Sequence, residues 1–249
     1  QPALKKKLVR RIEVCLSKKP SIISWNKAEE VISEYRHTSG RTEHSPSALR
    51  TDQKIEVVGV AISTGGPNAL SRFIPTLPQE FSAPVLVVQH IIPGFIEGIV
   101  RRLDSVCDVR VKIAEQDEAL KEGTVYFAPD RLHLRVKREA DDLHADLGSE
   151  PSGLLFCPSA DVLFNSMAEN CGNRCIGVIM TGMGHDGVVG LGAIKKTGGI
   201  TIAQDRESSA IYGMARVAVD AKIIDSIVPL EKISGELDRF MSTARRATR

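Results

Sequence analysis

The chain has 249 residues, of which 42% are hydrophobic and 26% charged, as in an ordinary globular protein with one large domain or two small ones. A net charge of +2 argues against strong general attraction to nucleic acid or anionic membranes, and 4% aromatic residues argue against stacking on single-stranded nucleic acid. No apolar run approaches a membrane span and no secretion signal is recognisable, so we expect no membrane insertion and a cytoplasmic location.

The first 52 residues differ from the rest of the chain. Apolar residues recur at helical spacing over 3–19, among lysines and arginines, which predicts a basic amphipathic helix. Such a helix either binds a partner, lies on a membrane surface, or connects domains with a solvated charged face. Residues 37–52 are polar and aperiodic, as in a flexible linker. We therefore place a helix and linker in 1–52 and a folded domain in 53–249.

Strand-like and helix-like segments alternate beyond this boundary. Nearly continuous apolar runs, typical of strands buried on both faces, cover 55–62, 85–89 and 176–180, and shorter runs cover 109–113 and 200–203. The helical segments between the runs are 67–77, 95–105, 159–171, 187–197, 209–219 and 230–243. This alternation predicts an α/β fold with a doubly wound, mostly parallel sheet and helices on both faces.

One region, 123–147, has a different pattern. Its segments 124–128, 132–136 and 143–147 alternate polar with apolar residues and are joined by turn-forming residues. This pattern predicts an antiparallel hairpin or meander appended to the parallel sheet. His133 and His144 alternate with apolar residues there, and we expect both to face solvent.

Cysteine usage gives no sign of a disulfide framework. The five cysteines are odd in number and irregularly spaced, at positions 15, 107, 157, 171 and 175. Cys171 and Cys175 could form half of a metal site, but no second pair or nearby histidine completes it. Reduced thiols and no bound metal are the expectation.

Three reactive residues directly follow or end predicted strands. Ser63 ends the first strand, His90 follows 85–89, and Asp186 lies in the glycine-rich segment after 176–180. In an open parallel sheet, sites collect beyond the carboxyl ends of the strands, so the three side chains are expected at one edge. Serine needs an adjacent base to act as a nucleophile, and a carboxylate orients a histidine base. The set therefore predicts a Ser–His–Asp catalytic triad, in a chain order unlike that of the α/β-hydrolases.

A phosphate-binding turn is the alternative interpretation of the segment at Ser63. A strand, a glycine-rich turn and a helix commonly bind phosphate at the helix N-terminus. Residues 59–66 have neither the G-x-G-x-x-G spacing nor the Gly-Lys-Ser/Thr of a P-loop, and no acid ends the second strand to bind a ribose. His185 is a competing base or metal ligand, although neighbours in sequence rarely point the same way.

Several motifs resemble the chemotaxis receptor methylesterases, the CheB-type protein-glutamate methylesterases. They are Ser-Thr-Gly-Gly-Pro from Ser63, Gln-His with Pro-Gly-Phe at 89–95, and Thr-Gly-Met-Gly-His-Asp-Gly at 181–187. Further matches are Gly-Thr-Val-Tyr-Phe-Ala-Pro at 123–129, Pro-Ser-Ala-Asp-Val-Leu-Phe at 158–164, and Ala-Gln-Asp followed by Tyr-Gly-Met at 203–214. The resemblance covers about 54–242.

The resemblance implies a fold and an activity. The fold is a doubly wound parallel sheet with an antiparallel hairpin, and the activity is hydrolysis of γ-methyl esters on receptor glutamates, with deamidation of receptor glutamines in many members. The family triad maps onto Ser63, His90 and Asp186, and the backbone N–H groups of Thr64 and Met183 map onto the oxyanion hole. No metal or organic cofactor is implied. The implied partners are the cytoplasmic helical regions of methyl-accepting receptors and a receiver domain upstream in the same protein. We expect that this receiver domain has been either cut away or lost.

Two positions depart from the family pattern, and two other functions stay open. His185 stands where the family usually has Asn, and Ala215 where Pro is frequent. The histidine puts the pKa values near Asp186 in question, and the alanine puts the start of a helix in question.

The alternative functions are a serine esterase acting on another protein or a small ester, and a non-catalytic adaptor with the same fold.

Overall fold

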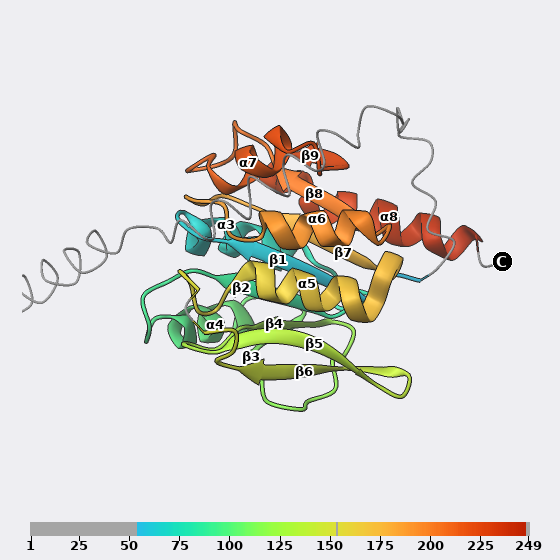
Figure 1. Ribbon diagram of the computed structural model, residues 1–249, viewed down its shortest axis with the longest axis horizontal. Helices are drawn as coiled ribbons and strands as arrows, with labels where there is room; N and C mark the ends of the chain where they lie inside the picture. Colours follow the sequence, from blue (N-terminus) through green and yellow to red (C-terminus); the bar gives the residue numbers. More distant parts are fainter. Residues whose placement is uncertain (1–53, 153, 248–249) are drawn as a thin grey trace, which may run out of the picture.

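The computed structural model describes residues 54–152 and 154–247, so the helix and linker predicted in 1–52 lie outside the described residues. Seven parallel strands form one sheet in the order β3-β4-β2-β1-β7-β8-β9 (Figure 1). This sheet confirms the predicted fold class, although no strand was predicted at β9. The strands are β1 (Val57–Ile62), β2 (Val85–Gln89), β3 (Arg110–Ile113), β4 (Thr124–Phe127), β7 (Cys175–Ile179), β8 (Ile200–Gln204) and β9 (Ser226–Val228).

The central strand β1 is an uninterrupted apolar run with six buried residues. It pairs in parallel with β2 on one side and β7 on the other. The chain builds the sheet outward from β1 through β2 to β4 and β3, then returns to β7 and builds the other half. The order of strands thus reverses beside β1, and such a reversal leaves a crevice beyond the carboxyl ends of the strands.

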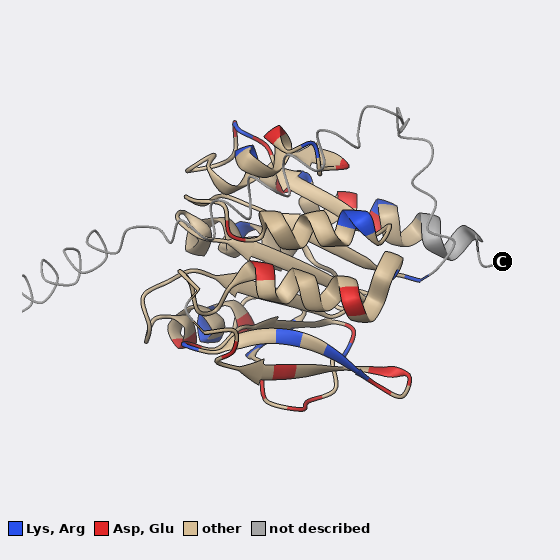
Figure 2. Cartoon of the chain, in the orientation of Figure 1, with Lys and Arg blue, Asp and Glu red and all other residues tan. Residues whose placement is uncertain are grey.

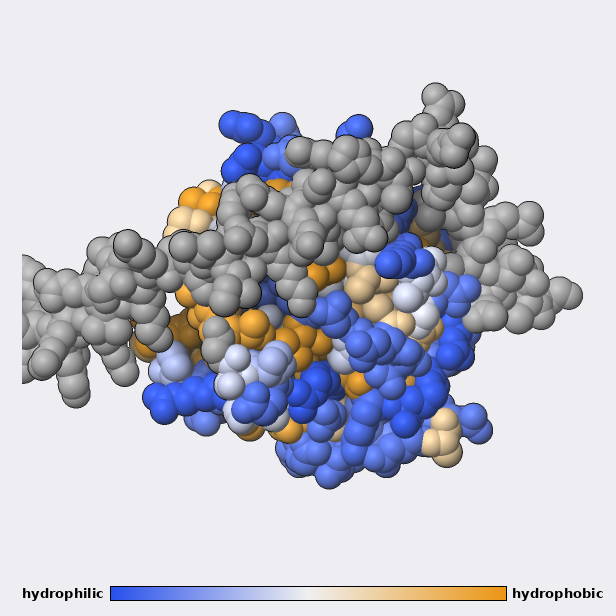
Figure 3. All heavy atoms as spheres, in the orientation of Figure 1, coloured by the Kyte–Doolittle hydropathy of each residue, from blue (hydrophilic) through white to orange (hydrophobic). Residues whose placement is uncertain are grey.

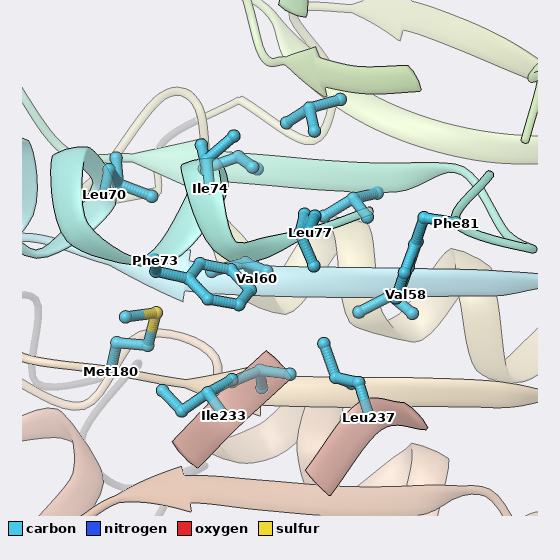
Figure 4. Packing of buried hydrophobic residues seen from close by; sticks show 14 of the residues in the cluster. Val58, Val60, Leu70, Phe73, Ile74, Leu77, Phe81, Met180, Ile233 and Leu237 are labelled. Carbon is cyan, nitrogen blue, oxygen red and sulfur yellow. The ribbon is translucent and has the colours of Figure 1, made fainter. Parts of the chain in front are cut away.

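Helices cover both faces of the sheet (Figure 1). One face carries α3 (Gly66–Phe73), α4 (Ile96–Asp104) and α8 (Ile233–Ala247), and the other α5 (Ala160–Cys171), α6 (Val188–Lys196) and α7 (Met214–Asp220). Short 3-10 turns occupy Ile74–Thr76, Gly172–Arg174 and Leu230–Lys232. In Figure 4, Phe73 lies beside Val60 of β1, with Ile233 and Leu237 of α8 nearby. Each such buried side chain stabilises the fold by about 1.5–3 kcal/mol.

The antiparallel hairpin consists of β5 (His133–Glu139) and β6 (Asp142–Gly148), and it packs beside α5. Charged residues occur on both strands (Figure 2), and Arg135 Nε lies 2.7 Å from an Asp146 oxygen. Glu56, next to β1, links the hairpin to the sheet because it pairs with Arg138 at 2.5 Å and with Arg174 at 2.7 Å.

Two expectations for this region are wrong. Residues 124–128 are not part of a meander, because β4 pairs in parallel with β2 and β3 inside the main sheet. His133 does not face solvent: it is 1% exposed, because the start of α5 covers the start of β5. His144 is partly exposed, with Nδ1 3.0 Å from the Asp117 carbonyl oxygen.

No helix of the described chain is long and apolar enough to cross a membrane.

Candidate active site

Ser63 lies one residue beyond the end of β1, where the chain turns into α3. Its backbone N–H donates to the Thr181 carbonyl at 3.0 Å, and its carbonyl accepts from the Gly66 N–H at 2.8 Å. Gly65 takes a φ of 84°, a left-handed conformation that glycine adopts without strain. The abrupt end of the strand is therefore a tight turn that fixes the backbone of Ser63 at the edge of the sheet.

Gln89, which ends β2, connects the turn to the next strand end. Its side chain is buried, and Nε2 donates to the Ser63 carbonyl at 3.0 Å and to the His90 carbonyl at 2.8 Å. A Cβ on Gly66 would collide with the Gln89 side chain, so residue 66 has to be glycine for this bridge to form. Sequence reasoning missed Gln89, although a polar residue closing an apolar strand was a visible signal.

The His90 ring is nearly buried, with 8% of its side chain exposed. Nε2 lies 2.8 Å from Asp186 Oδ2, and the ring stacks on Phe156 with centroids 4.2 Å apart and planes inclined by 8°. Within 54–152 and 154–247, neither ring nitrogen has a well-aligned hydrogen-bond partner, so the carboxylate oxygen lies off the line of the N–H bond. Catalytic hydrogen bonds of this kind often align only when substrate binds.

Asp186 is held by the first turn of α5. Oδ1 accepts from the Ser159 hydroxyl at 2.7 Å and from the Asp161 N–H at 3.2 Å, and Oδ2 accepts from the Ala160 N–H at 2.7 Å. Ser159 is the N-cap residue, yet its hydroxyl does not bond to its own helix. The Asp186 carboxylate instead accepts from the first N–H groups of the helix, at its positive end.

The charge of Asp186 is set by opposing effects. Burial raises the pKa of its carboxyl, but the contact with His90 and the donors from Ala160 and Ser159 outweigh burial, so the pKa is lowered. Neighbouring Asp161 has a raised pKa because of burial first and the negative charge of Asp186 second. Asp186 is therefore the carboxyl of this pair that stays ionised beside His90.

The loop from Thr181 to Gly187 runs beside Ser63. A Cβ on Gly182 would lie 2.7 Å from the Ser63 Cβ, which shows how closely the two backbones approach. Ser63, His90 and Asp186 thus lie on adjoining strand ends at one edge, as the sequence predicted for the three positions.

The two candidate oxyanion donors lie at the same edge. Thr64 is exposed, and Met183 is 71% exposed. Their backbone N–H groups take part in none of the backbone hydrogen bonds of the described residues, so both remain available to a substrate oxygen.

The two departures from the family pattern are buried. His185 is 8% exposed and precedes Asp186 in the loop, and Ala215 is buried in the first turn of α7. The helix begins at Met214 without a proline, one residue after Gly213. In the described residues no group of three metal-ligating side chains occurs, and the cysteines at 107, 157, 171 and 175 are free thiols.

Large apolar side chains are exposed in the segments that border the site. They are Ile92, Phe95, Leu154, Leu155, Met183 and Ile211, each between 38% and 71% exposed. Figure 3 shows hydrophobic surface in the left half of the view, the side on which β1 ends and α3 begins. Exposed apolar residues that form a contiguous patch are typical of a surface that contacts another macromolecule.

The structure thus defines an α/β protein in which Ser63, His90 and Asp186 lie on adjoining strand ends at the carboxyl edge of the sheet. Residues 58–237 match the CheB methylesterase family. The chain belongs to this family, as the motifs around Ser63, His90 and Asp186 predicted.

Relatives and a solved structure agree with this assignment. The chain is 43% identical over 176 residues to a protein-glutamate methylesterase/protein-glutamine glutaminase of Pyrococcus horikoshii, covering 71% of this chain and 48% of that protein. It is 40% identical over 182 residues to such a protein of Nitratidesulfovibrio vulgaris, covering 73% and 50%. The CheB methylesterase catalytic domain of Thermotoga maritima superposes with a TM-score of 0.72 at 37% identity, covering 74% of this chain and 97% of that domain. The chain spans about half the length of the curated relatives it matches.

Proposed function

We propose that this chain is a protein-glutamate methylesterase that removes γ-methyl esters from glutamates of methyl-accepting chemotaxis receptors. The relatives bear that name, and the family match covers the candidate site. The observation that carries the proposal is the 2.8 Å approach of His90 Nε2 to an Asp186 carboxylate held ionised by α5. A histidine oriented in this way is a base for the neighbouring Ser63 hydroxyl.

The proposed reaction is acyl transfer through a covalent intermediate. Ser63 Oγ attacks the ester carbonyl, and His90 accepts the serine proton at Nδ1, since Nε2 faces Asp186. The carbonyl oxygen becomes an oxyanion that the N–H groups of Thr64 and Met183 stabilise, each lowering the barrier by about 3 kcal/mol. His90 then protonates the departing methoxide, methanol leaves, and water hydrolyses the acyl-enzyme to the glutamate and free Ser63.

The same site can act on receptor glutamines. An amide attacked by Ser63 loses ammonia instead of methanol and gives the same acyl-enzyme, so one set of residues serves both reactions. The relatives' names include protein-glutamine glutaminase, which supports this second activity.

The proposed partner is the receptor's cytoplasmic helical region. The exposed apolar side chains around the site are its contact surface, and the chain acts in the cytoplasm. A receiver domain upstream in the same protein is a further proposed partner, since the chain spans about half the length of the relatives it matches.

The test is methanol release from membranes that carry receptors with radiolabelled γ-methyl esters. Ser63→Ala should abolish release and leave the thermal unfolding midpoint unchanged, because only the hydroxyl is lost from a turn held by backbone hydrogen bonds. Ser71→Ala is the matched control, because Ser71 is an exposed serine of α3. Turnover by Ser63→Ala would refute the assignment of the nucleophile. Hydrolysis of small esters without release from receptors would point to a different esterase, and no turnover of either would point to an adaptor.

A further inference from the structure

A buried histidine and a buried serine connect to Asp186 through the start of α5. The Ser159 hydroxyl donates to Asp186 Oδ1 at 2.7 Å, and the Ser159 backbone N–H donates to His133 Nδ1 at 3.0 Å. Ser159 is 2% exposed and His133 is 1% exposed. The hydrolysis steps given above use neither residue, and the positions 133 and 159 lie far from Ser63 and His90 in sequence.

The contact fixes the protonation state of His133. Nδ1 accepts a hydrogen bond, so it carries no proton, and the ring is the neutral tautomer with hydrogen on Nε2. Burial lowers the pKa of His133, and the hydrogen bond to the Pro151 backbone opposes this effect. The charged groups that act on the ring are Arg135 on the same strand, Asp186 in the loop after β7, and Glu150 after the hairpin.

We propose that His133 is a positioning residue for the hydrolytic reaction, acting through the Ser159 N–H to fix the turn that holds Asp186. This inference rests on the proposed function. Ser159, Ala160 and Asp161 supply three donors to the carboxylate, and all three belong to one turn. The acceptor on His133 anchors the first residue of that turn to the hairpin.

The geometry explains why a displaced turn would alter the chemistry. Oδ2 of Asp186 faces both the Ala160 N–H and His90 Nε2, so a shift of the turn moves the carboxylate that orients the base. Misplacement of a catalytic group by about 1 Å costs roughly 100-fold in rate. Protonated His133 would present Nδ1–H to the Ser159 N–H, and two facing donors would push the turn away.

The first experiment compares His133→Leu, which removes the acceptor, with His133→Asn, whose side-chain oxygen keeps an acceptor near the Nδ1 position. At mildly alkaline pH, His133→Leu should lower kcat for methanol release by about 10- to 100-fold with little change in KM, as other supporting residues behind catalytic groups do. His133→Asn should retain most of the activity. His144→Leu on the other hairpin strand is the control and should match the unaltered chain.

The second experiment uses the pH profile. In the unaltered chain, the fall of kcat at acid pH should include the binding of one proton to His133, which turns Nδ1 from an acceptor into a donor. In His133→Asn, which binds no proton at residue 133, kcat should fall less steeply, with one proton fewer. This arm remains decisive where His133→Leu fails to fold: an equally steep fall in His133→Asn overturns the proposal, as does unaltered kcat in a folded His133→Leu.

The third readout does not depend on the substrate. The ¹⁵N resonance of His90 Nε2, which lies 2.8 Å from Asp186 Oδ2, reports on that contact in the full chain. His133→Leu should shift or broaden this resonance, while His133→Asn leaves it in place. An unaltered chain that releases no methanol refutes the proposed function, and the NMR comparison then decides on the positioning role by itself. An unchanged resonance in His133→Leu overturns the positioning role.

Discussion

The two sides of the site are built differently. On the Asp186 side, a buried carboxylate receives three donors from one helix turn and contacts His90. On the Ser63 side, Thr64 and Met183 are exposed, and so are apolar side chains such as Phe95. The carboxylate that carries the charge is thus held in place before substrate arrives, whereas the part that contacts substrate is open. A large substrate can reach Ser63 without displacing that carboxylate.

The largest effect on kcat is expected when the negative charge of Asp186 is removed from the buried side of the site. Asp186→Asn should lower kcat by about 10⁴-fold, as the equivalent change does in another serine hydrolase, because the amide favours the wrong tautomer of His90. Asp146→Asn, in the partly exposed hairpin pair with Arg135, is the matched control. A loss below tenfold would contradict the role given to Asp186.

The same variant has a pH signature. The folded-state pKa of Asp186 is lowered, so its ionised form stabilises the fold above the unfolded-state pKa of 3.8, and this contribution is lost as pH falls through the folded-state value. Asp186→Asn should therefore lower the free energy of unfolding at neutral pH by about 1–3 kcal/mol, because the donors of α5 then face an amide instead of a carboxylate. Its stability should vary less with pH below 3.8 than that of the unaltered chain. Urea unfolding at several pH values measures both effects.

The next test concerns the close approach of two loops on the open side. Gly182→Ala places a Cβ 2.7 Å from the Ser63 Cβ, so the turn at Ser63 has to move, and we expect a loss of kcat of roughly 10- to 100-fold. Gly98→Ala in α4, where a Cβ meets nothing within 4 Å, should stabilise the fold by about 0.5–1 kcal/mol. Equal kcat in Gly182→Ala and the unaltered chain would show that Ser63 tolerates the displacement.

A third change tests the bridge between the two strand ends. Gln89→Met keeps a similar volume but removes the donor to the Ser63 and His90 carbonyls. We expect a destabilisation of about 1–3 kcal/mol, because buried carbonyls lose their partner, with a smaller loss of kcat than in Gly182→Ala. Thermal unfolding and initial rates, measured on the same preparation, separate the two effects. Unchanged stability would mean that water replaces the amide.

The smallest effect on activity is expected far from the site. Glu56→Gln weakens the pairs with Arg138 and Arg174, and should cost about 1–3 kcal/mol of stability while kcat stays within twofold. Glu122→Gln, in the exposed pair with Lys54, should change stability by less than about 0.5 kcal/mol. A large loss of kcat in Glu56→Gln would show that the hairpin anchor influences the site, contrary to the contrast drawn here.

The sequence predicts the parallel sheet well because its strands are buried on both faces and leave long apolar runs, as in β1 and β7. It fails at β4, because a short alternation of polar and apolar residues does not distinguish a hairpin strand from a parallel strand, and all four residues of β4 are buried. His133 was misjudged for a related reason: alternation defines the two faces of a strand, but not which face a distant helix covers.

The site is predictable where it depends on strand ends and unpredictable where it depends on tertiary contact. Ser63, His90 and Asp186 directly follow apolar runs, so the parallel topology alone brings them together. Phe156 stacks on His90 from a segment between the hairpin and α5, and no local pattern announces that contact. A serine before α5 predicts a helix start, yet its hydroxyl serves a carboxylate 27 residues later in the chain.

The central position of β1 has a consequence for how the protein unfolds and loses activity. Ser63 follows the strand with parallel partners on both sides, so its placement cannot loosen at an edge before the rest of the sheet opens. Amide protons of Val58 to Ala61 should exchange with solvent only through global opening. Heat inactivation and loss of the whole fold should then coincide in one cooperative transition. The position of Ser63 is therefore as stable as the sheet itself.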